Sequence, residues 1–363
     1  MSGEVTAPIV GPTTTPVAPE HGRVVTPRLA RHHITLDDGH EVGVAVSGRG
    51  VPLVVVHGFS AEGILYAQTL SRLVGLGFKV IAIDVAGHGG TLGLPTGAGT
   101  FSNYTDLLIR VLDHLGIERA ILAGHSMGGR LVTELAATQP DRAIAVILLD
   151  AIVGDAWDRL VNLFRICPPL LAGVGVALVV DTLSTVPLLR DPVQARKLGR
   201  LVTPTLLGHV RRPWRLVGPA VSIMRSRGSR WMLQRIAEEH IPLFAIHGDR
   251  DFAVPMATSR SAASRGHGEL VVVHGGSHSW LLKDPESLPA IMQRLMQGRL
   301  GTAVRTAISD GGVDPDDADE DAIESVFYEP NAVVLQLTPA GGAIHDIEQL
   351  HRRPRYRFSI TME

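Results

Sequence analysis

The stretch AILAGHSMGG, residues 120–129, decides the fold that we expect for this chain. It opens with a short, β-rich apolar run, and from Met127 onward its composition is that of a helix. Between the two stands a G-x-S-x-G motif formed by Gly124, Ser126 and Gly128. A tight strand-to-helix turn of this kind projects a serine Oγ above a sheet, and the glycines remove side chains that would clash there. The motif therefore makes Ser126 a candidate nucleophile.

On both sides of this motif, apolar runs of strand length alternate with segments of helical pattern. The strand-like runs cover residues 33–36, 42–46, 53–56, 80–83, 120–123, 145–149, 243–246 and 270–273. The helix-like segments cover residues 62–75, 103–115, 127–139 and 284–296. This alternation predicts an α/β fold, with a mostly parallel sheet that carries helices on both faces.

Composition divides the chain further. Residues 1–27 are rich in Pro, Thr and Val and lack a signal-peptide pattern, so we expect a disordered leader and a cytoplasmic protein. Residues 28–153 and 236–300 form the predicted core. Between them, residues 154–235 lack strand signals and predict a helical cap inserted into the core.

Residues 301–363 predict an acidic linker and a C-terminal extension. The segment Asp310–Glu329 is acidic and low in apolar residues, which is typical of a solvated segment. Beyond it, the apolar runs 333–337 and 356–360 predict a small appended hairpin.

Three further loops carry groups that a nucleophilic serine needs. The strand-like run before His57 leads into a turn whose next backbone N–H, that of Phe59, can join that of Met127 as an oxyanion donor. The run before Gly248 is followed by Asp249 and Asp251. Two histidines, His274 and His278, follow the last run of the core, and Asp150 ends an earlier one.

These motifs resemble the α/β-hydrolase family, in its serine esterase and lipase-like branch, over residues 31–300. The sequence Gly-x-x-Asp followed by Val254-Pro255 is similar to the acid loop of that family, which implies Asp251 as the acid rather than Asp249 or Asp150. The position after Gly-Gly-Ser looks like the family's histidine, which implies His278 as the base rather than His274. The chain order Ser, Asp, His agrees with this fold.

Two other histidines lie in motifs of the same family. The loop Asp84-x-x-Gly87-His88-Gly89 resembles one that shapes the site, so we expect no catalytic role for His88. We expect His125, inside the turn that holds Ser126, to be a packing residue.

The resemblance implies acyl transfer from a carboxylic ester with an apolar acyl part, without a metal or organic cofactor. C–C bond hydrolysis of ring-cleavage products and acyl transfer to another acceptor use the same triad and stay open. A non-enzymatic binding module is a further alternative.

Charge limits the partners. The net charge is −2, which does not favour nucleic-acid binding, and the single cysteine, Cys167, excludes an intrachain disulfide.

Residues 154–235 nevertheless hold thirteen basic and four acidic residues, together with the apolar run 170–180. Basic, apolar and Trp residues together are typical of a segment that lies on a membrane, although an ordinary lid with solvated arginines fits the same composition. The predicted ligand is a small-molecule or lipid ester, with peripheral membrane contact through the basic cap.

Overall fold

The computed structural model describes residues 29–59, 61–94, 99–185, 196, 199–200, 202–203, 207–208, 211, 213–337 and 353–363. The leader expected over residues 1–27 lies outside this part of the chain. The described strands form one sheet in the order β1-β2-β4-β3-β5-β6-β7-β8-β9. Strands β3 to β8 run parallel, whereas β1, β2 and β9 are antiparallel to their neighbours. Their bounds are β1 Ala30–Thr35, β2 Glu41–Ser47, β3 Val51–Val56, β4 Phe78–Ile83, β5 Ala120–His125, β6 Ala143–Leu149, β7 Leu243–Gly248, β8 Glu269–His274 and β9 Arg357–Met362.

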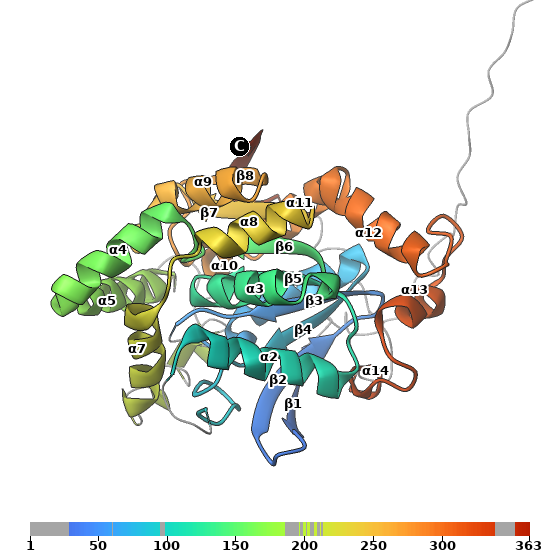
Figure 1. The fold of residues 1–363 in the computed structure, drawn as a ribbon, viewed down its shortest axis with the longest axis horizontal. Coiled ribbons are helices and arrows are strands. Elements are labelled where there is room, and N and C mark those ends of the chain that lie inside the picture. Colours follow the sequence, from blue (N-terminus) through green and yellow to red (C-terminus); the bar gives the residue numbers. More distant parts are fainter. Residues whose placement is uncertain are drawn as a thin grey trace, which may run out of the picture.

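Helices cover this sheet as the alternation in the sequence predicts. Strands β3 to β7 are buried along their whole length, because the helices exclude water from both faces. Helices α2, α3 and α8 lie side by side along the sheet in Figure 1. The core helices are α1 Ala67–Leu73, α2 Phe101–Leu115, α3 Met127–Thr138, α9 Met256–Arg265, α10 Trp280–Lys283 and α11 Ser287–Met296, and the short 3-10 helices are η1 Gly63–Tyr66, η2 Val74–Leu76 and η3 Pro140–Arg142.

A helical segment enters between β6 and β7, over the range where the sequence predicts a cap. It consists of α4 Asp155–Ile166, α5 Pro168–Ser184, η4 Pro213–Leu216, α7 Val217–Arg225 and α8 Arg230–Glu238. Helices α4 and α5 project together from one side of the molecule (Figure 1). Among the described residues no single helix is long and apolar enough to cross a membrane.

The C-terminal part differs from the predicted hairpin. The prediction of a strand over residues 333–337 is wrong, because Val333–Gln336 forms helix α14, whose Val334 is buried and which contacts α2. The run 356–360 does form a strand, β9, but it pairs with β8 at the edge of the main sheet. A β-rich run needs a free strand edge as a partner, and the edge of β8 provides one for β9.

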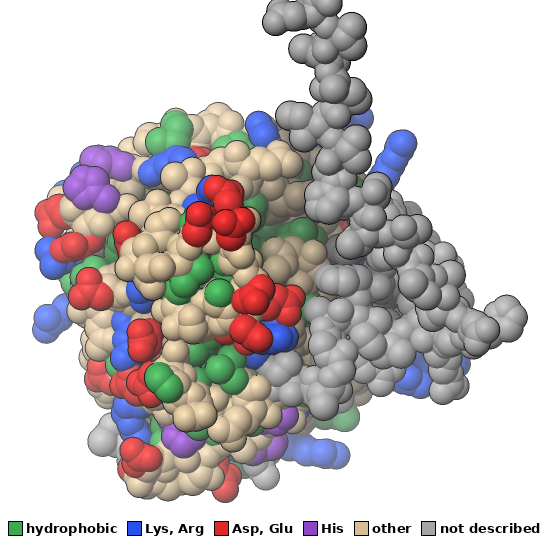
Figure 2. Space-filling view, turned by 90° about the vertical axis from the view of Figure 1, so that its right-hand side faces the viewer, with side chains coloured by type: hydrophobic (Ala, Val, Ile, Leu, Met, Phe, Trp, Pro, Cys, Tyr) green, Lys and Arg blue, Asp and Glu red, His purple; other side chains and the backbone are tan. Residues whose placement is uncertain are grey.

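The acidic segment is anchored to the core. Helix α12 Arg299–Asp310 leads into this segment, α13 Glu320–Phe327 lies within it, and Phe327 is fully buried. Arg49 pairs with Glu320, Asp321 and Glu324 of α13, and the hydroxyl of Tyr328 donates to the carbonyl of Gly50. Figure 2 looks onto this side of the molecule, where acidic side chains gather on the surface. Apolar residues on one face of α13 therefore attach an acidic segment that we expected to be solvated.

Candidate active site

The candidate site is organised around Ser126, in the turn between β5 and α3. The φ angle of Ser126 is 52°, a left-handed value that costs energy for a residue with a side chain. Its N–H donates to the carbonyl of Leu149 and its own carbonyl accepts from Ile152, so β6 holds this strained turn. A Cβ atom at Gly128 would collide with the Val56 carbonyl, which explains why the motif needs glycine there. The surrounding backbone therefore fixes the position of Ser126.

Asp251 and His278 form a close pair at the same edge of the sheet. His278 Nδ1 lies 2.7 Å from Asp251 Oδ2, and the other carboxylate oxygen accepts from the N–H groups of Ala253 and Val254. An ionised carboxylate accepts only, so Nδ1 carries the proton and Nε2 is left able to accept one. Both side chains are buried. The pair thus has the tautomer that a general base requires.

The charges of this pair oppose the effect of burial. Burial lowers the pKa of His278, but the negative charge of Asp251 and its hydrogen bond outweigh this and raise the pKa above its ordinary value. Burial likewise raises the pKa of Asp251, but the neighbouring His278 holds the net pKa below its usual range. Each partner therefore stabilises the charged form of the other.

Ser126 and His278 line one small cavity of about 40 Å³, together with Phe59. His125 lies against His278, with ring centroids 4.7 Å apart, and its Nε2 bonds to the His278 carbonyl at 3.0 Å. Its Nδ1 lies 2.9 Å from the Tyr66 hydroxyl. Burial, followed by the charge of His278, lowers the pKa of His125 to about 3, so this imidazole is neutral. His125 is thus a packing residue, as expected, and it also holds the backbone of His278.

The two residues expected to supply oxyanion donors, Phe59 and Met127, border the same cavity as Ser126. Met127 is the first residue of α3, where backbone N–H groups have no acceptor within the helix. Phe59 follows β3, and a Cβ atom at the preceding Gly58 would lie 2.9 Å from Ser126 Cβ. The loop after β3 therefore lies against the serine.

The competing residues have other partners. The Asp249 carboxylate accepts from the N–H of Gly275 at 2.7 Å and lies 3.3 Å from His274 Nδ1, on a partly exposed surface. Asp249 therefore caps a turn, and His274 pairs with it away from Ser126. The carboxylate of Asp84 accepts from Gly63 and Gly90, which agrees with a role in shaping its loop.

Asp150 supports the site from within the core. It is fully buried, and it accepts from Gly248 N–H at 2.8 Å and from Trp280 Nε1–H at 2.6 Å. Burial, and then the charge of Asp251, raises its pKa well above the ordinary value. Asp150 therefore links the loop of the acid to the helix that follows His278. Sequence reasoning missed this role, and it missed Tyr66 and His247, because nothing local indicates their partners.

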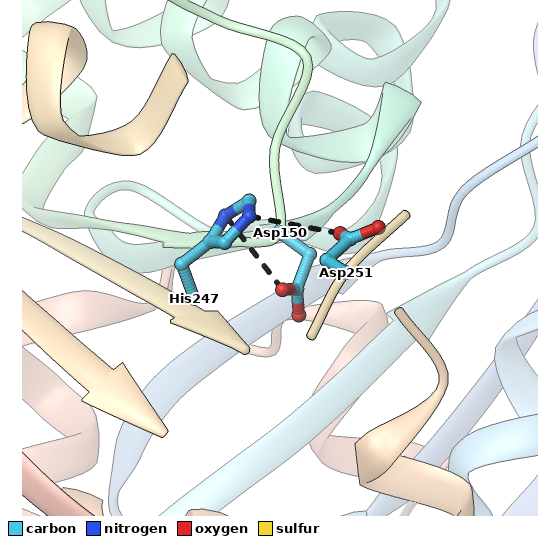
Figure 3. Close-up of side chains that lie close together, drawn as sticks. All are labelled: Asp150, His247 and Asp251. Atoms are coloured by element: carbon cyan, nitrogen blue, oxygen red, sulfur yellow. Dashed lines mark ion pairs between the residues drawn. The ribbon is translucent and has the colours of Figure 1, made fainter. Parts of the chain in front are cut away.

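Figure 3 shows the imidazole of His247 facing the carboxylates of both Asp150 and Asp251, each 3.7 Å away. Their nearest ligand atoms lie within 4.8 Å of one another, a spacing that could hold a metal ion. However, His247 Nε2 bonds to the carbonyl of Val254 and Nδ1 to the hydroxyl of Ser259, and both carboxylates accept N–H groups. Because these donors and acceptors already satisfy one another, we interpret the cluster as a hydrogen-bonded support.

A second cavity, of about 260 Å³, also reaches Ser126. Its walls are mainly apolar and include Trp157, Leu171, Val174 and Ile223. Phe59, Ser126 and Leu178 border both cavities, whereas His278 borders only the small one. The serine thus stands at the junction of an apolar chamber and a chamber that contains the histidine.

Comparison with known proteins agrees with this fold and site. A family model described as "Serine aminopeptidase, S33" matches residues 51–286. A protein of Mycobacterium phage D29 named "Putative non-heme haloperoxidase" is 35% identical over 260 residues, which are 70% of this chain and 90% of that protein. A monoacylglycerol lipase of Mycolicibacterium smegmatis is 28% identical over 247 residues, which are 66% and 84% of the two chains.

A carboxylesterase structure from the thaumarchaeon Nitrososphaera gargenis shares the fold at a TM-score of 0.58 and 23% identity, covering 76% of this chain and all of that one. The sheet, its helices and the turn at Ser126 define a hydrolase of the α/β-hydrolase fold. Within that class, the chain belongs to the family described as serine aminopeptidase, S33.

Proposed function

We propose that this chain is a serine hydrolase that cleaves carboxylic esters with an apolar acyl part. The observation that carries the proposal is the position of Ser126 at the junction of two unlike cavities. One is large and mainly apolar, and the other contains the imidazole of His278. An apolar chamber next to a nucleophile suits an alkyl chain, because the chain leaves water as it binds.

In the proposed reaction, Ser126 Oγ attacks the ester carbonyl while His278 Nε2 takes its proton. Asp251 holds the imidazole and stabilises the imidazolium that forms. The N–H groups of Phe59 and Met127 stabilise the oxyanion. His278 then returns the proton to the leaving alcohol. Water next attacks the acyl carbonyl while His278 takes a proton from it, and His278 delivers this proton to Ser126 Oγ as the carboxylic acid leaves.

The position of His278 also orients the substrate. Since the base must protonate the leaving oxygen, that oxygen has to face the side of the site that His278 borders. The acyl chain then extends along α5 into the apolar chamber, past Leu171 and Val174.

A series of p-nitrophenyl esters from acetate to long acyl chains tests this function. We expect kcat/KM to rise as the acyl chain lengthens until the apolar chamber is filled. Gly175 borders that chamber, and a Cβ atom there would meet nothing within 4 Å. The variant Gly175→Leu should therefore lower kcat/KM for long esters by about tenfold relative to acetate, since single methylene groups are discriminated on this scale.

Gly173→Leu is the matched control. Gly173 also lies in α5 with nothing within 4 Å of its Cβ position, but it is exposed. This variant should leave the chain-length preference unchanged. Equal effects of the two variants would refute the assignment of the acyl chamber, and failure on every ester would favour C–C bond hydrolysis.

A further inference from the structure

Helix α5 has an apolar surface that the fold leaves exposed. Asp181 is its only charged residue, yet none of the seventeen residues from Pro168 to Ser184 is buried. A helix that is apolar around its whole circumference normally lies inside a protein or in contact with lipid. We therefore expect the exposed apolar surface of α5 to contact another molecule.

The helix has two apolar stripes. Leu171, Leu178 and Thr182 share one face, by their helical spacing, and border the two cavities at Ser126. Val176 and Val180 lie on the outer face, where their exposed fractions are 65% and 61%. Leu183 is exposed on that same face. The cavities at Ser126 explain why the inner stripe is apolar, but they do not explain the apolar outer face.

The end of α4 carries further exposed apolar residues. Ile166, the last residue of α4, is 83% exposed, and Leu163 is exposed one turn earlier. Arg159 is also exposed and shares this face, since residues 159, 163 and 166 follow helical spacing. We name Leu163, Ile166, Val176, Val180 and Leu183 the outer apolar surface.

Positive charge borders this surface. The guanidinium of Arg165 donates to the carbonyls of Met224 and Ser226, at the end of α7. These bonds bring Arg165 close to Arg225 and Arg227, and all three side chains are exposed. The chain next to Ile166 therefore carries three exposed arginines, Arg165, Arg225 and Arg227, whose backbones lie close together.

Among the described residues, the acidic side chains of the cap form no ion pair with these three arginines. Asp155 pairs with Arg230 and Arg265, and Asp158 accepts from Ser229. Asp181 accepts from the N–H of Ser279. These are the three acidic residues that the structure describes between residues 154 and 235.

An anionic lipid surface fits these features better than a second copy of the chain. Two caps that met through this surface would bring two arginine clusters together, and their like charges would repel. A lipid surface instead offers acyl chains to the outer apolar surface and anionic headgroups to the arginines.

We propose that α4 and α5 dock this protein on a membrane that contains anionic lipid. The outer apolar surface enters the acyl region, and Arg225 and Arg227 contact the headgroups. The inner stripe of the docked α5 would then keep the apolar chamber next to the lipid. The docking itself is independent of the proposed esterase chemistry.

Co-sedimentation of the full chain with vesicles tests this proposal. We expect binding to phosphatidylglycerol–phosphatidylcholine vesicles, and at least tenfold weaker binding to phosphatidylcholine alone. Val176→Asp/Val180→Asp should lower binding about tenfold or more, because two charges would enter the acyl region. Arg225→Gln/Arg227→Gln should lower binding to anionic vesicles by about fivefold for each residue and should leave binding to neutral vesicles unchanged.

Met362→Asp is the control, because Met362 is equally exposed but lies on β9. It should bind vesicles as the wild type does. Thermal unfolding and hydrolysis of a soluble ester show whether each variant is folded and whether the esterase proposal itself holds. Two results would overturn the docking proposal: negligible wild-type binding to both kinds of vesicle, or equal binding by the Val176→Asp/Val180→Asp variant. A wild-type dimer that this variant separates, without vesicle binding, would assign the surface to a second copy instead.

Discussion

Helices α3 and α5 are both rich in apolar residues, and both lie next to Ser126, but they differ in burial. Every residue from Met127 to Ala137 in α3 is buried, whereas no residue of α5 is. Helix α3 contacts β3, β5 and β6, as well as α2 and α8. Helix α5 contacts α4 and lines two cavities.

This difference in burial agrees with two different roles, holding the nucleophile and admitting the substrate. A nucleophile has to be held rigidly, so the turn at Ser126 is backed by a helix that is packed on all sides. A substrate has to enter and leave, so the chamber is walled by a helix with few neighbours, which can move at low cost. Apolar composition alone does not distinguish these tasks, because packing decides between them.

The largest effect on activity should come from replacing Ser126, which directly precedes helix α3. Ser126→Ala removes the nucleophile, so kcat for a soluble p-nitrophenyl ester should fall by about 10⁴-fold or more. A fluorophosphonate probe should label the wild type and Val176→Ala, but not Ser126→Ala. Residual turnover within tenfold of the wild type would rule out Ser126 as the nucleophile.

The acid loop gives the next largest effect. Asp251→Asn removes the charge that holds His278 in its tautomer, and we expect kcat to fall by about 10³–10⁴-fold. Asp249→Asn is the matched change in the same loop, and it should have a small effect because Asp249 contacts Gly275 and His274 rather than His278. Steady-state kinetics of both variants would measure this, and the opposite ranking would reassign the acid.

Truncations of side chains in the two helices should change the free energy of unfolding by different amounts. Leu131 in α3 is fully buried, so Leu131→Ala should lower the free energy of unfolding by about 2–5 kcal/mol. Val176→Ala in α5 should change it by less than about 0.5 kcal/mol, since that side chain already faces solvent. Urea denaturation of both variants gives the two values. Similar losses would mean that α5 is packed against something the described residues do not include.

The smallest effect is a shift in pH dependence. His278 has to be neutral to act as a base, and its pKa is raised by Asp251, so activity should fall as the pH drops through a value above the ordinary 6.5. The acid limb of kcat/KM against pH reports this pKa in the free enzyme. In Asp251→Asn the midpoint should move to lower pH, because burial then dominates. An unchanged midpoint would mean that another group controls the limb.

The fold could be predicted from the sequence wherever the signal is local. Period and composition indicate strands β3 to β8 and the helices that follow β3, β4 and β5, although they missed α9 between β7 and β8. The motif G-x-S-x-G at Ser126 needs only its own turn. The C-terminal region could not be predicted in this way. The same kind of β-rich run becomes α14 at Val333–Gln336 and β9 at Arg357–Met362, because only the second finds an open strand edge.

The sequence by itself determined the class of the fold, the candidate nucleophile and, through resemblance, the loops that carry Asp251 and His278. Only the tertiary structure decided which carboxylate meets which imidazole, that Asp150 bonds to Trp280, and that one apolar helix is buried while the other is exposed. The physical reason is that local pattern sets backbone conformation. Hydrogen-bond partners, burial and pKa depend instead on residues that are distant in the chain.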